Sequence, residues 1–341
     1  MDIQAALAQL VDGQNLTQAQ TRAVFQEVMS GVATPAQIGG LLMAMRIKGE
    51  TAEEIAGAAQ TMRALSTKVE IDVPHLVDTC GTGGSSSAKL FNISTAAAFV
   101  AAAAGAKVAK HGNRKMTSQS GSADVLEVAG VNIDLKPEQI TRCISEVGVG
   151  FLFAQAHHSA MRYAAPIRQE LKVRTMMNLL GPLTNPANAK RQVIGVFSAE
   201  WQQALADVLK LLGAEHVLVV HSHGLDEIAL DNSSLVVELK NGHIEHYEIS
   251  PVDFDIKQRS TDSLHADSPS SSFTLLKDSL TKPDSAAADI VSLNAGAAIY
   301  ASGVATTLAN GVTMAQDVIA AGLAKERLDE LVRVSRLMSE P

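Results

Sequence analysis

The first 67 residues carry a helical pattern with three repeated helix-start signals. Thr17, Thr34 and Thr51 each stand three residues before Gln or Glu, which is the spacing of a capping box. The pattern predicts four short helices. Residues 39–45 are apolar on nearly all sides, so their helix is expected to be buried within the bundle or against a second subunit.

From about residue 72 short apolar runs alternate with helical segments. The runs cover residues 75–79, 107–109, 192–197 and 216–221, and residues 95–104 between the first two form an alanine-rich helical segment. This alternation predicts an α/β fold, in which helices cover a largely parallel sheet. Asn241-Gly242 separates two further runs, 234–240 and 243–249, and is typical of a hairpin. Residues 260–272 are rich in Ser and Asp and are expected to form a surface loop, and helices return after Ala286.

Composition narrows the class of protein. The 341 residues, 46% hydrophobic and 19% charged, suit one large globular domain or two smaller ones. A net charge of −8 argues against a general nucleic-acid binder. Two cysteines, Cys80 and Cys143, make no disulfide framework or zinc cluster. With no signal peptide and no apolar run long enough to span a bilayer, a cytoplasmic protein without membrane contact is expected.

Candidate chemistry begins at the glycine-rich stretch 78–85. Gly81, Gly83 and Gly84 lie between the first strand and a helix, and without β-carbons their N–H groups can turn toward one point. A helix N-terminus behind them adds donors and partial positive charge, which favours phosphate. Ser86 stands where a dinucleotide fingerprint needs glycine, and a P-loop sequence is absent. The stretch is therefore a tight connection or a phosphate site of a third kind.

A second polar loop, residues 110–122, follows the next strand. Lys110 and Arg114 supply charge-assisted donors to an anion, and the loop adds hydroxyl groups and glycine. A further helix starts near Asp124. Because ligands of α/β proteins bind where parallel strands end, the two loops are expected to meet there.

These segments resemble the anthranilate phosphoribosyltransferase family. The resemblance covers nearly the whole chain in family order. It is carried by residues 81–84, 92–95, 110–114, 120–124, 162–168, 178–186 and 224–227. It implies a helical domain, residues 1–70, joined by a helical segment near 165–190, and an α/β domain, residues 71–341. An active site at the hinge and a homodimer formed through the helical domains are also implied.

The resemblance further implies a reaction. Anthranilate takes the ribose of phosphoribosyl pyrophosphate (PRPP) and pyrophosphate leaves, a step of tryptophan biosynthesis. Such a transfer needs fixed donors and Mg²⁺ at the leaving group more than a covalent nucleophile. Lys110 and Arg168 are expected to act by positioning and charge.

Residue roles follow the same resemblance. The PRPP-binding residues are Gly81, Gly84, Ser85, Lys89, Asn92, Ile93, Ser94, Thr95, Lys110, His111, Gly112, Asn113, Arg114, Ser118 and Ser122. The anthranilate-binding residues are Gly81, His111, Asn113, His158, Met161 and Arg168, with Arg168 clamping the carboxylate. The metal ligands are Ser94, Asp226 and Glu227, since Mg²⁺ prefers oxygen and is commonly shared with substrate phosphates. Adjacent acidic residues in a loop are otherwise usually only solvated.

The adjacent histidines and Cys80 could suggest other chemistry. His157 and His158 are expected to line the acceptor entrance and not to bind metal, because adjacent side chains point in different directions. Cys80 is expected to be a packed small side chain. The sequence departs from the family at Ser85-Ser86, in a loop one residue longer before Asn92, and at Gln119, Gln155 and Ser159.

Two alternative functions remain open at this point. A pyrimidine-nucleoside phosphorylase-like enzyme would need a longer chain with an extra C-terminal part. A non-enzymatic nucleic-acid-binding relative is disfavoured by the acidic net charge and by the pair Asp226 and Glu227.

Overall fold

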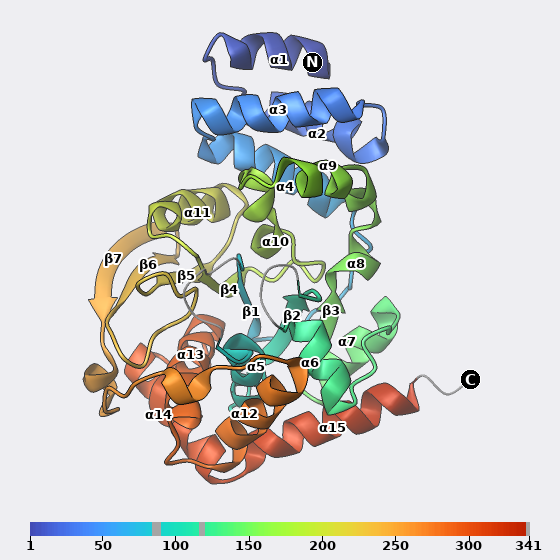
Figure 1. Cartoon of the computed structure of the whole chain (residues 1–341). Coiled ribbons are helices and arrows are strands. Elements are labelled where there is room, and N and C mark those ends of the chain that lie inside the picture. Colours follow the sequence, from blue (N-terminus) through green and yellow to red (C-terminus); the bar gives the residue numbers. More distant parts are fainter. Residues whose placement is uncertain (84–89, 116–119, 339–341) are drawn as a thin grey trace.

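The N-terminal part of the chain is a helical bundle at one end of the molecule (Figure 1). The structure is a computed structural model that describes residues 1–83, 90–115 and 120–338. The bundle comprises α1 (Ile3–Val11), α2 (Gln18–Ser30), α3 (Pro35–Lys48) and α4 (Ala52–Leu65). The three capping boxes, at Thr17, Thr34 and Thr51, are present as predicted. In α3 the side chains of Ile38, Leu41, Leu42 and Met45 are buried within the chain itself.

The rest of the chain is built on a seven-stranded sheet in the order β3-β2-β1-β4-β5-β6-β7. Its strands are β1 (Leu76–Gly81), β2 (Lys107–Gly112), β3 (Val149–Phe153), β4 (Arg191–Gly195), β5 (His216–His221), β6 (Ser234–Lys240) and β7 (His243–Ile249). The first five pair in parallel, and β6 and β7 are antiparallel. Asn241 and Gly242 have φ of 51° and 81°, as a type I′ hairpin turn requires. The predicted α/β fold and hairpin are confirmed.

Helices and short turns connect the strands and cover the sheet. Between β1 and β4 lie α5 (Ile93–Ala103), α6 (Ser122–Ala129), α7 (Pro137–Glu146), α8 (Ala154–His157), η1 (Ser159–Tyr163), α9 (Ala165–Leu171), η2 (Met176–Asn178) and α10 (Leu180–Leu183). After β4 come α11 (Glu200–Leu211), η3 (Pro251–Phe254), η4 (Asp262–Leu264), α12 (Pro269–Thr281), α13 (Ala286–Ser302), α14 (Leu308–Ala320) and α15 (Leu323–Leu337). No helix of the described ranges is long and apolar enough to cross a membrane.

The predicted surface loop at residues 260–272 is wrong for residues 262–264 and from Pro269 onward. Residues 262–264 form η4, and α12 begins at Pro269, with the Ser268 hydroxyl accepting from the Ser271 N–H at 3.2 Å. Serines that suggest a loop by composition serve here as helix-capping groups. Leu264 is 1% exposed, so the segment contributes to the core.

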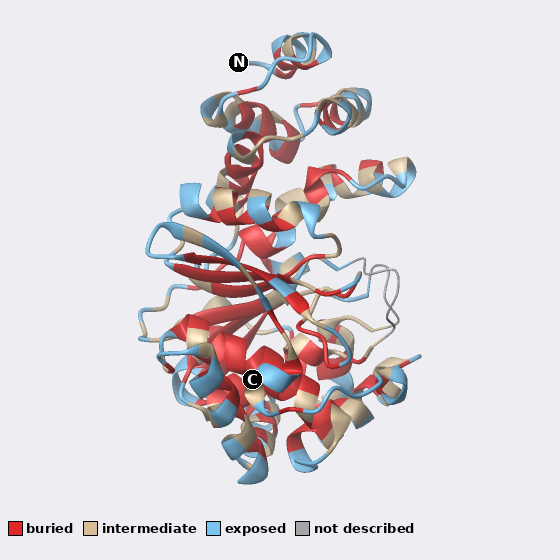
Figure 2. Ribbon diagram, turned by 90° about the vertical axis from the view of Figure 1, so that its left-hand side faces the viewer, coloured by how far each residue is buried: buried red, intermediate tan, exposed pale blue. Residues whose placement is uncertain are grey.

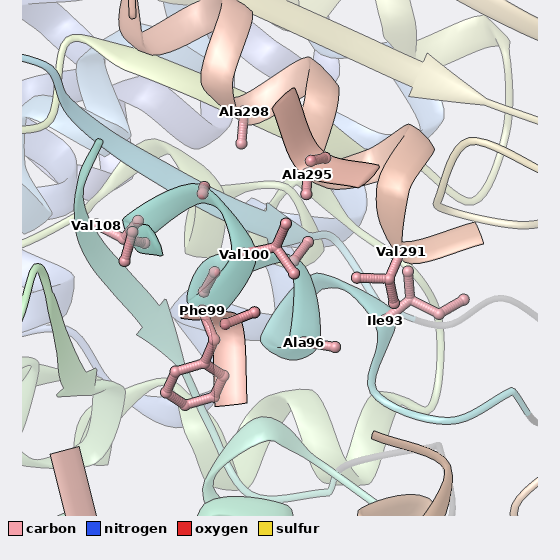
Figure 3. Packing of buried hydrophobic residues seen from close by; sticks show 14 of the residues in the cluster. Ile93, Ala96, Phe99, Val100, Val108, Val291, Ala295 and Ala298 are labelled. Carbon is pink, nitrogen blue, oxygen red and sulfur yellow. The ribbon is translucent and has the colours of Figure 1, made fainter. Parts of the chain in front are cut away.

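The sheet separates two apolar clusters, because alternate strand residues face opposite sides. Val193 and Leu218 face a cluster formed with α5 and α13, whereas Ile194 and Val219 face the side that contains α11. Figure 3 shows the first cluster, where Ile93, Ala96 and Val100 of α5 pack toward Val291 and Ala295 of α13. The parallel strands are mostly buried in the middle of the molecule, whereas the edge strand β7 is mostly exposed (Figure 2).

The segment between α8 and β4 returns to the helical bundle. Ile167 of α9 and Leu180 of α10 belong to the same apolar cluster as Phe25 of α2 and Val217 of β5. This cluster is continuous from the bundle to the sheet. The division into two domains at residue 70, with a joining helical segment near 165–190, stays a prediction.

A buried carboxylate on β6 provides a test of acid stability. Glu238 accepts hydrogen bonds from Tyr247 at 2.6 Å and Tyr300 at 2.9 Å, and its Oε1 lies 2.8 Å from Nε2 of His216. Burial raises the pKa of Glu238, but the bonds from His216, Tyr247 and Tyr300 outweigh burial and lower it from 4.5 to about 2. Because the folded-state pKa is lower than the unfolded one, the ionised group stabilises the fold at neutral pH.

We expect Glu238→Gln to lower the free energy of unfolding by roughly 2 kcal/mol at pH 7. The difference from the wild type should shrink as the pH falls from 4.5 toward 2, where the native carboxyl takes up its proton. Urea unfolding at several pH values measures it, with the exposed Glu248→Gln as control. A difference that does not change with pH would contradict this role.

Candidate functional site

The strand order places a topological switch point between β1 and β4. From β1 the chain proceeds through β2 to β3 on one side, and from β4 through β5 on the other. Gly81 and Gly195, the last residues of β1 and β4, are register partners. Ligands of open α/β sheets bind at the carboxyl ends of strands at such a point. Both predicted loops start at this edge, after β1 and after β2.

Asp226 lies directly over this switch point, and two glycines make room for it. A β-carbon on Gly195 would stand 1.6 Å from the Asp226 carbonyl oxygen, and one on Gly81 would stand 2.6 Å from its Oδ2. The Gly83 N–H donates to the same Oδ2 at 3.1 Å. The carboxylate therefore contacts the start of the glycine-rich loop. Gly195 was missed, since a lone glycine at a strand end gives no sign of what approaches it.

Glu227 faces the start of α5. The Ser94 N–H donates to Oε1 of Glu227 at 3.2 Å, and Nζ of Lys110 donates to the Ser94 hydroxyl at 3.3 Å. Burial and then the charge of Asp226 raise the pKa of Glu227 to about 8, against the lowering effect of Lys110. The three residues predicted to bind metal thus lie together, and a cation there would offset the repulsion between the two carboxylates.

Lys110 is buried under the start of α5, with 3% of its surface exposed. Its ammonium group donates to the Thr79 carbonyl as well as to Ser94. Lys110 therefore links the end of β1 to the start of α5.

A buried aspartate that the sequence left without a role holds the neighbouring strand. Oδ1 of Asp78 accepts from the His111 N–H at 3.1 Å, and Oδ2 accepts from Nδ2 of Asn185 at 2.7 Å. Burial raises the pKa of Asp78 above its usual value, although the charge of Lys110 and the hydrogen bond from Asn185 act in the opposite direction. Asp78 is fully buried, so the bonds to His111 and Asn185 compensate its lost hydration. It ties β1 to β2 and to the segment after α10.

The two loops meet, as predicted. Nδ2 of Asn92, at the start of α5, donates to the Ser120 carbonyl at 3.1 Å. Ser122 donates to the Asn113 carbonyl at 3.4 Å, and Oδ1 of Asn113 accepts from Gln155 at 3.3 Å. Gly112, Ile93 and Thr95 lie in the same two segments. Gly84, Ser85, Lys89 and Ser118, together with Gln119, lie outside the described residues, and their predicted roles stay predictions.

Arg114 differs from the arrangement expected of a phosphate ligand. Its guanidinium group forms an ion pair with Glu127 and lies 5.5 Å from the centre of the Phe153 ring. These contacts turn the side chain toward α6 and β3. A role in phosphate binding would require Arg114 to exchange Glu127 for the ligand.

Two buried histidines, His111 at the end of β2 and His158 after α8, contact each other. The rings of His111 and His158 meet edge to face with centres 5.2 Å apart. Burial, and then the neighbouring His158, lowers the pKa of His111 well below its ordinary value, and burial lowers that of His158 to about 4. Both rings are therefore neutral near pH 7. Within the described part of the chain, Nε2 of each ring has no hydrogen-bond partner.

His157 has a different position from His158. Its Nδ1 lies 2.6 Å from the Thr67 carbonyl, in the segment that leaves α4. It is buried and ties the bundle connection to α8. The two adjacent histidines thus have different partners, and the expectation that they line the acceptor entrance stays a prediction.

Arg168 lies on α9, which follows the short turn η1 that carries Met161. Among the described residues no acidic side chain forms an ion pair with it, unlike the paired Arg114 and Arg142. Burial lowers the pKa of Arg168. A partly buried guanidinium without an acidic partner fits the binding of a ligand carboxylate.

The thiol of Cys80 is not suited to act as a nucleophile in this site. Burial and then the charge of Asp78 raise the pKa of the Cys80 thiol well above its ordinary value, which suits a packed thiol.

The acidic side chains of the site bear on metal binding. No group of three or more His, Cys, Asp or Glu side chains in the described ranges could hold a metal ion. The carboxylate oxygens of Asp226 and Glu227 are of the ligand type that Mg²⁺ prefers, and Mg²⁺ commonly takes its other ligands from substrate phosphates and water.

A cleft of about 660 Å³ lies at the opposite ends of the strands, where β1 and β4 begin. It is lined by the connection 68–76, by Arg63 and by residues 185–191. None of the predicted site residues lines it, so its size does not make it the candidate site.

The architecture and the site define a class of protein. Residues 73–325 match the family model described as "Glycosyl transferase family, a/b domain", and residues 4–66 match its "helical bundle domain" counterpart. The protein is thus a glycosyltransferase with a helical bundle and an α/β domain.

Individual relatives narrow this class. The anthranilate phosphoribosyltransferase of Marinomonas sp. (strain MWYL1) is 55% identical over 100% of this chain and 99% of the relative. That of Hahella chejuensis is 56% identical, with 100% and 99% covered. The structure of the Thermus thermophilus enzyme superposes with a TM-score of 0.91 at 41% identity, covering 97% of this chain and 99% of that one. The chain belongs to the anthranilate phosphoribosyltransferase family, and the resemblance in its motifs is confirmed.

A more distant relative shares the fold. The anthranilate phosphoribosyltransferase of Saccharomyces cerevisiae in complex with PRPP and Mg has a TM-score of 0.87 at 23% identity, with 98% of each chain covered.

Proposed function

We propose that this protein transfers the phosphoribosyl group of PRPP to the amine of anthranilate, giving N-(5-phosphoribosyl)anthranilate and pyrophosphate in tryptophan biosynthesis. The observation that carries the proposal is the position of Asp226 and Glu227. Asp226 accepts from the N–H of Gly83, just after β1, and Glu227 accepts from the N–H of Ser94, in the first turn of α5. Both contacts lie at the switch point of the sheet. The full-length similarity to named enzymes of this activity supports the same assignment.

The residues around PRPP, which donates the phosphoribosyl group, act by position and charge. In the transfer, the bond between ribose C1 and the diphosphate oxygen breaks and a bond from C1 to the anthranilate nitrogen forms. Negative charge develops on the departing diphosphate, so fixed donors at that place lower the barrier. We assign this role to the N-terminal turn of α5 and to Lys110. Bound Mg²⁺, held by Asp226 and Glu227 with Ser94 nearby, would neutralise part of the diphosphate charge.

The acceptor side needs to hold a planar acid. Arg168 offers a fork for the carboxylate, and His111 and His158 offer neutral ring surfaces and free Nε2 atoms. The aromatic amine attacks C1 as the neutral species and then loses a proton. Because both rings are neutral near pH 7, they add no positive charge that would compete with Arg168 for the carboxylate.

The activity is tested by mixing the protein with anthranilate, PRPP and Mg²⁺ and following the loss of anthranilate fluorescence. We expect turnover that stops when any one component is omitted, with one pyrophosphate released per anthranilate consumed. Phosphorolysis of a pyrimidine nucleoside without anthranilate turnover would favour the phosphorylase alternative. Tight, salt-dependent binding of DNA without turnover would favour the nucleic-acid-binding alternative.

The assembly proposed for the protein is a homodimer formed through the helical bundle. Supporting it, Val11, Val32 and Ile47 of the bundle are 76%, 70% and 81% exposed, and apolar side chains of that exposure suit a contact between copies. A solution-mass measurement on the wild type and on Ile47→Glu tests it.

The location proposed for the protein is the cytoplasm. The free thiols of Cys80 and Cys143 support this location.

A further inference from the structure

The donor site has a support from a distant part of the chain. Ser272 lies in the first turn of α12, and its side chain is fully buried. Its hydroxyl oxygen accepts from the Asn92 N–H at 3.0 Å and donates to Oδ1 of Asn92 at 2.6 Å. The two residues are 180 positions apart in the sequence, and the first turn of α12 lies at the end of the segment 260–272, whose composition suggested a surface loop.

This pair of bonds fixes which way the Asn92 amide faces. A hydroxyl group has one hydrogen and accepting lone pairs, so one oxygen serves both the N–H and Oδ1 of Asn92. With Oδ1 held by Ser272, Nδ2 must face the other way, and it donates to the Ser120 carbonyl at 3.1 Å. Asn92 therefore joins the start of α5 to the second loop, and Ser272 sets its orientation.

Two other hydroxyl groups of α12, those of Ser279 and Thr274, form bonds within their own helix. Ser279 donates to the Leu276 carbonyl at 2.7 Å, and Thr274 to the Ser270 carbonyl at 3.1 Å. Ser272 is directed instead toward the site. The backbone of the same region is fixed separately, because the Phe91 N–H donates to the Leu264 carbonyl at 3.1 Å and Leu90 bridges to His265. Removing the Ser272 hydroxyl should thus disturb the Asn92 side chain more than the path of the chain.

We propose that Ser272 is a positioning residue for PRPP binding. It orients the Asn92 side chain, and Asn92 in turn holds the start of α5 against Ser120 of the second polar loop. The inference rests on the proposed function, because it assigns Ser272 to the donor and not to the acceptor half of that site. Ser272 is fully buried, so its proposed effect on PRPP binding is exerted through Asn92 and not by direct contact.

The test compares Ser272→Ala with Ser279→Ala, a buried serine of the same helix. We expect Ser272→Ala to raise KM for PRPP about tenfold, the size of one net hydrogen bond, with KM for anthranilate unchanged. Ser279→Ala should leave both KM values unchanged. Asn92→Ala should raise KM for PRPP at least as much as Ser272→Ala does, and the double variant should be no worse than Asn92→Ala alone.

The outcomes separate this inference from the proposed function. A wild type without turnover contradicts the proposed function, whereas an active wild type with an unchanged KM for PRPP in Ser272→Ala overturns the positioning role. Additive effects in the double variant also overturn it. Should Ser272→Ala not fold, Asn92→Asp replaces it: the carboxylate still accepts from Ser272 but cannot donate to Ser120, so an unchanged KM for PRPP would again overturn the role.

Discussion

Replacing Asp226 with asparagine is expected to lower kcat/KM for PRPP by about 100- to 1,000-fold, the effect of losing several kcal/mol of charge stabilisation at the leaving group. Asparagine has nearly the same shape and can still accept from Gly83, whose N–H lies 3.1 Å from the carboxylate. The change therefore removes the charge and leaves the fit over Gly81 and Gly195. KM for anthranilate should change little.

The measurement is steady-state kinetics at several Mg²⁺ concentrations. If the loss lies in the metal-linked charge, high Mg²⁺ should restore part of the activity of Asp226→Asn. Asp231→Asn is the control, because Asp231 is an exposed carboxylate five positions further along the chain. Equal kinetics for the wild type and Asp226→Asn would exclude Asp226 from the site.

The second large effect is expected on the acceptor side. Arg168→Ala should raise KM for anthranilate about 100-fold, since truncating one partner of a partly buried charge pair costs several kcal/mol. The guanidinium has no acidic partner among the described residues, and burial lowers its pKa, so its favourable pairing is left to the ligand. KM for PRPP should remain near its wild-type value.

Two further variants sharpen this test. Arg168→Lys keeps the charge but loses the bidentate fork, and should lie between the alanine variant and the wild type. Arg162→Ala is the matched control, because Arg162 is exposed and its guanidinium lies over the neighbouring Tyr163 ring. An Arg168→Ala enzyme with unchanged KM for anthranilate, or one that loses PRPP and anthranilate binding equally, would contradict the assignment.

The sequence predicted best what is decided locally. The capping boxes at Thr17, Thr34 and Thr51 and the turn at Asn241-Gly242 depend on residues within three positions of one another. Local hydrogen bonds and backbone preferences are enough to specify them. The parallel sheet followed from alternating elements, and the meeting of the two loops followed from that sheet.

What the sequence did not show depends on distant partners. Gly195 is required because the Asp226 backbone lies against it, and Asp78 is compensated by Asn185, which is 107 positions away. Ser272 stood in a stretch whose composition indicated a loop, because serine is common both in loops and in helix caps. Arg114 was expected to face phosphate, and Glu127 on the next helix engages it instead.

A crystal structure with PRPP and Mn²⁺ would show whether PRPP and its metal bind where β1 and β4 diverge. Anomalous scattering locates the Mn²⁺ ions independently of the rest of the map. We expect an anomalous peak within coordination distance of the Asp226 and Glu227 carboxylates, with the diphosphate against residues 92–95. PRPP in the cleft beside residues 68–76, or Mn²⁺ away from both carboxylates, would contradict this expectation.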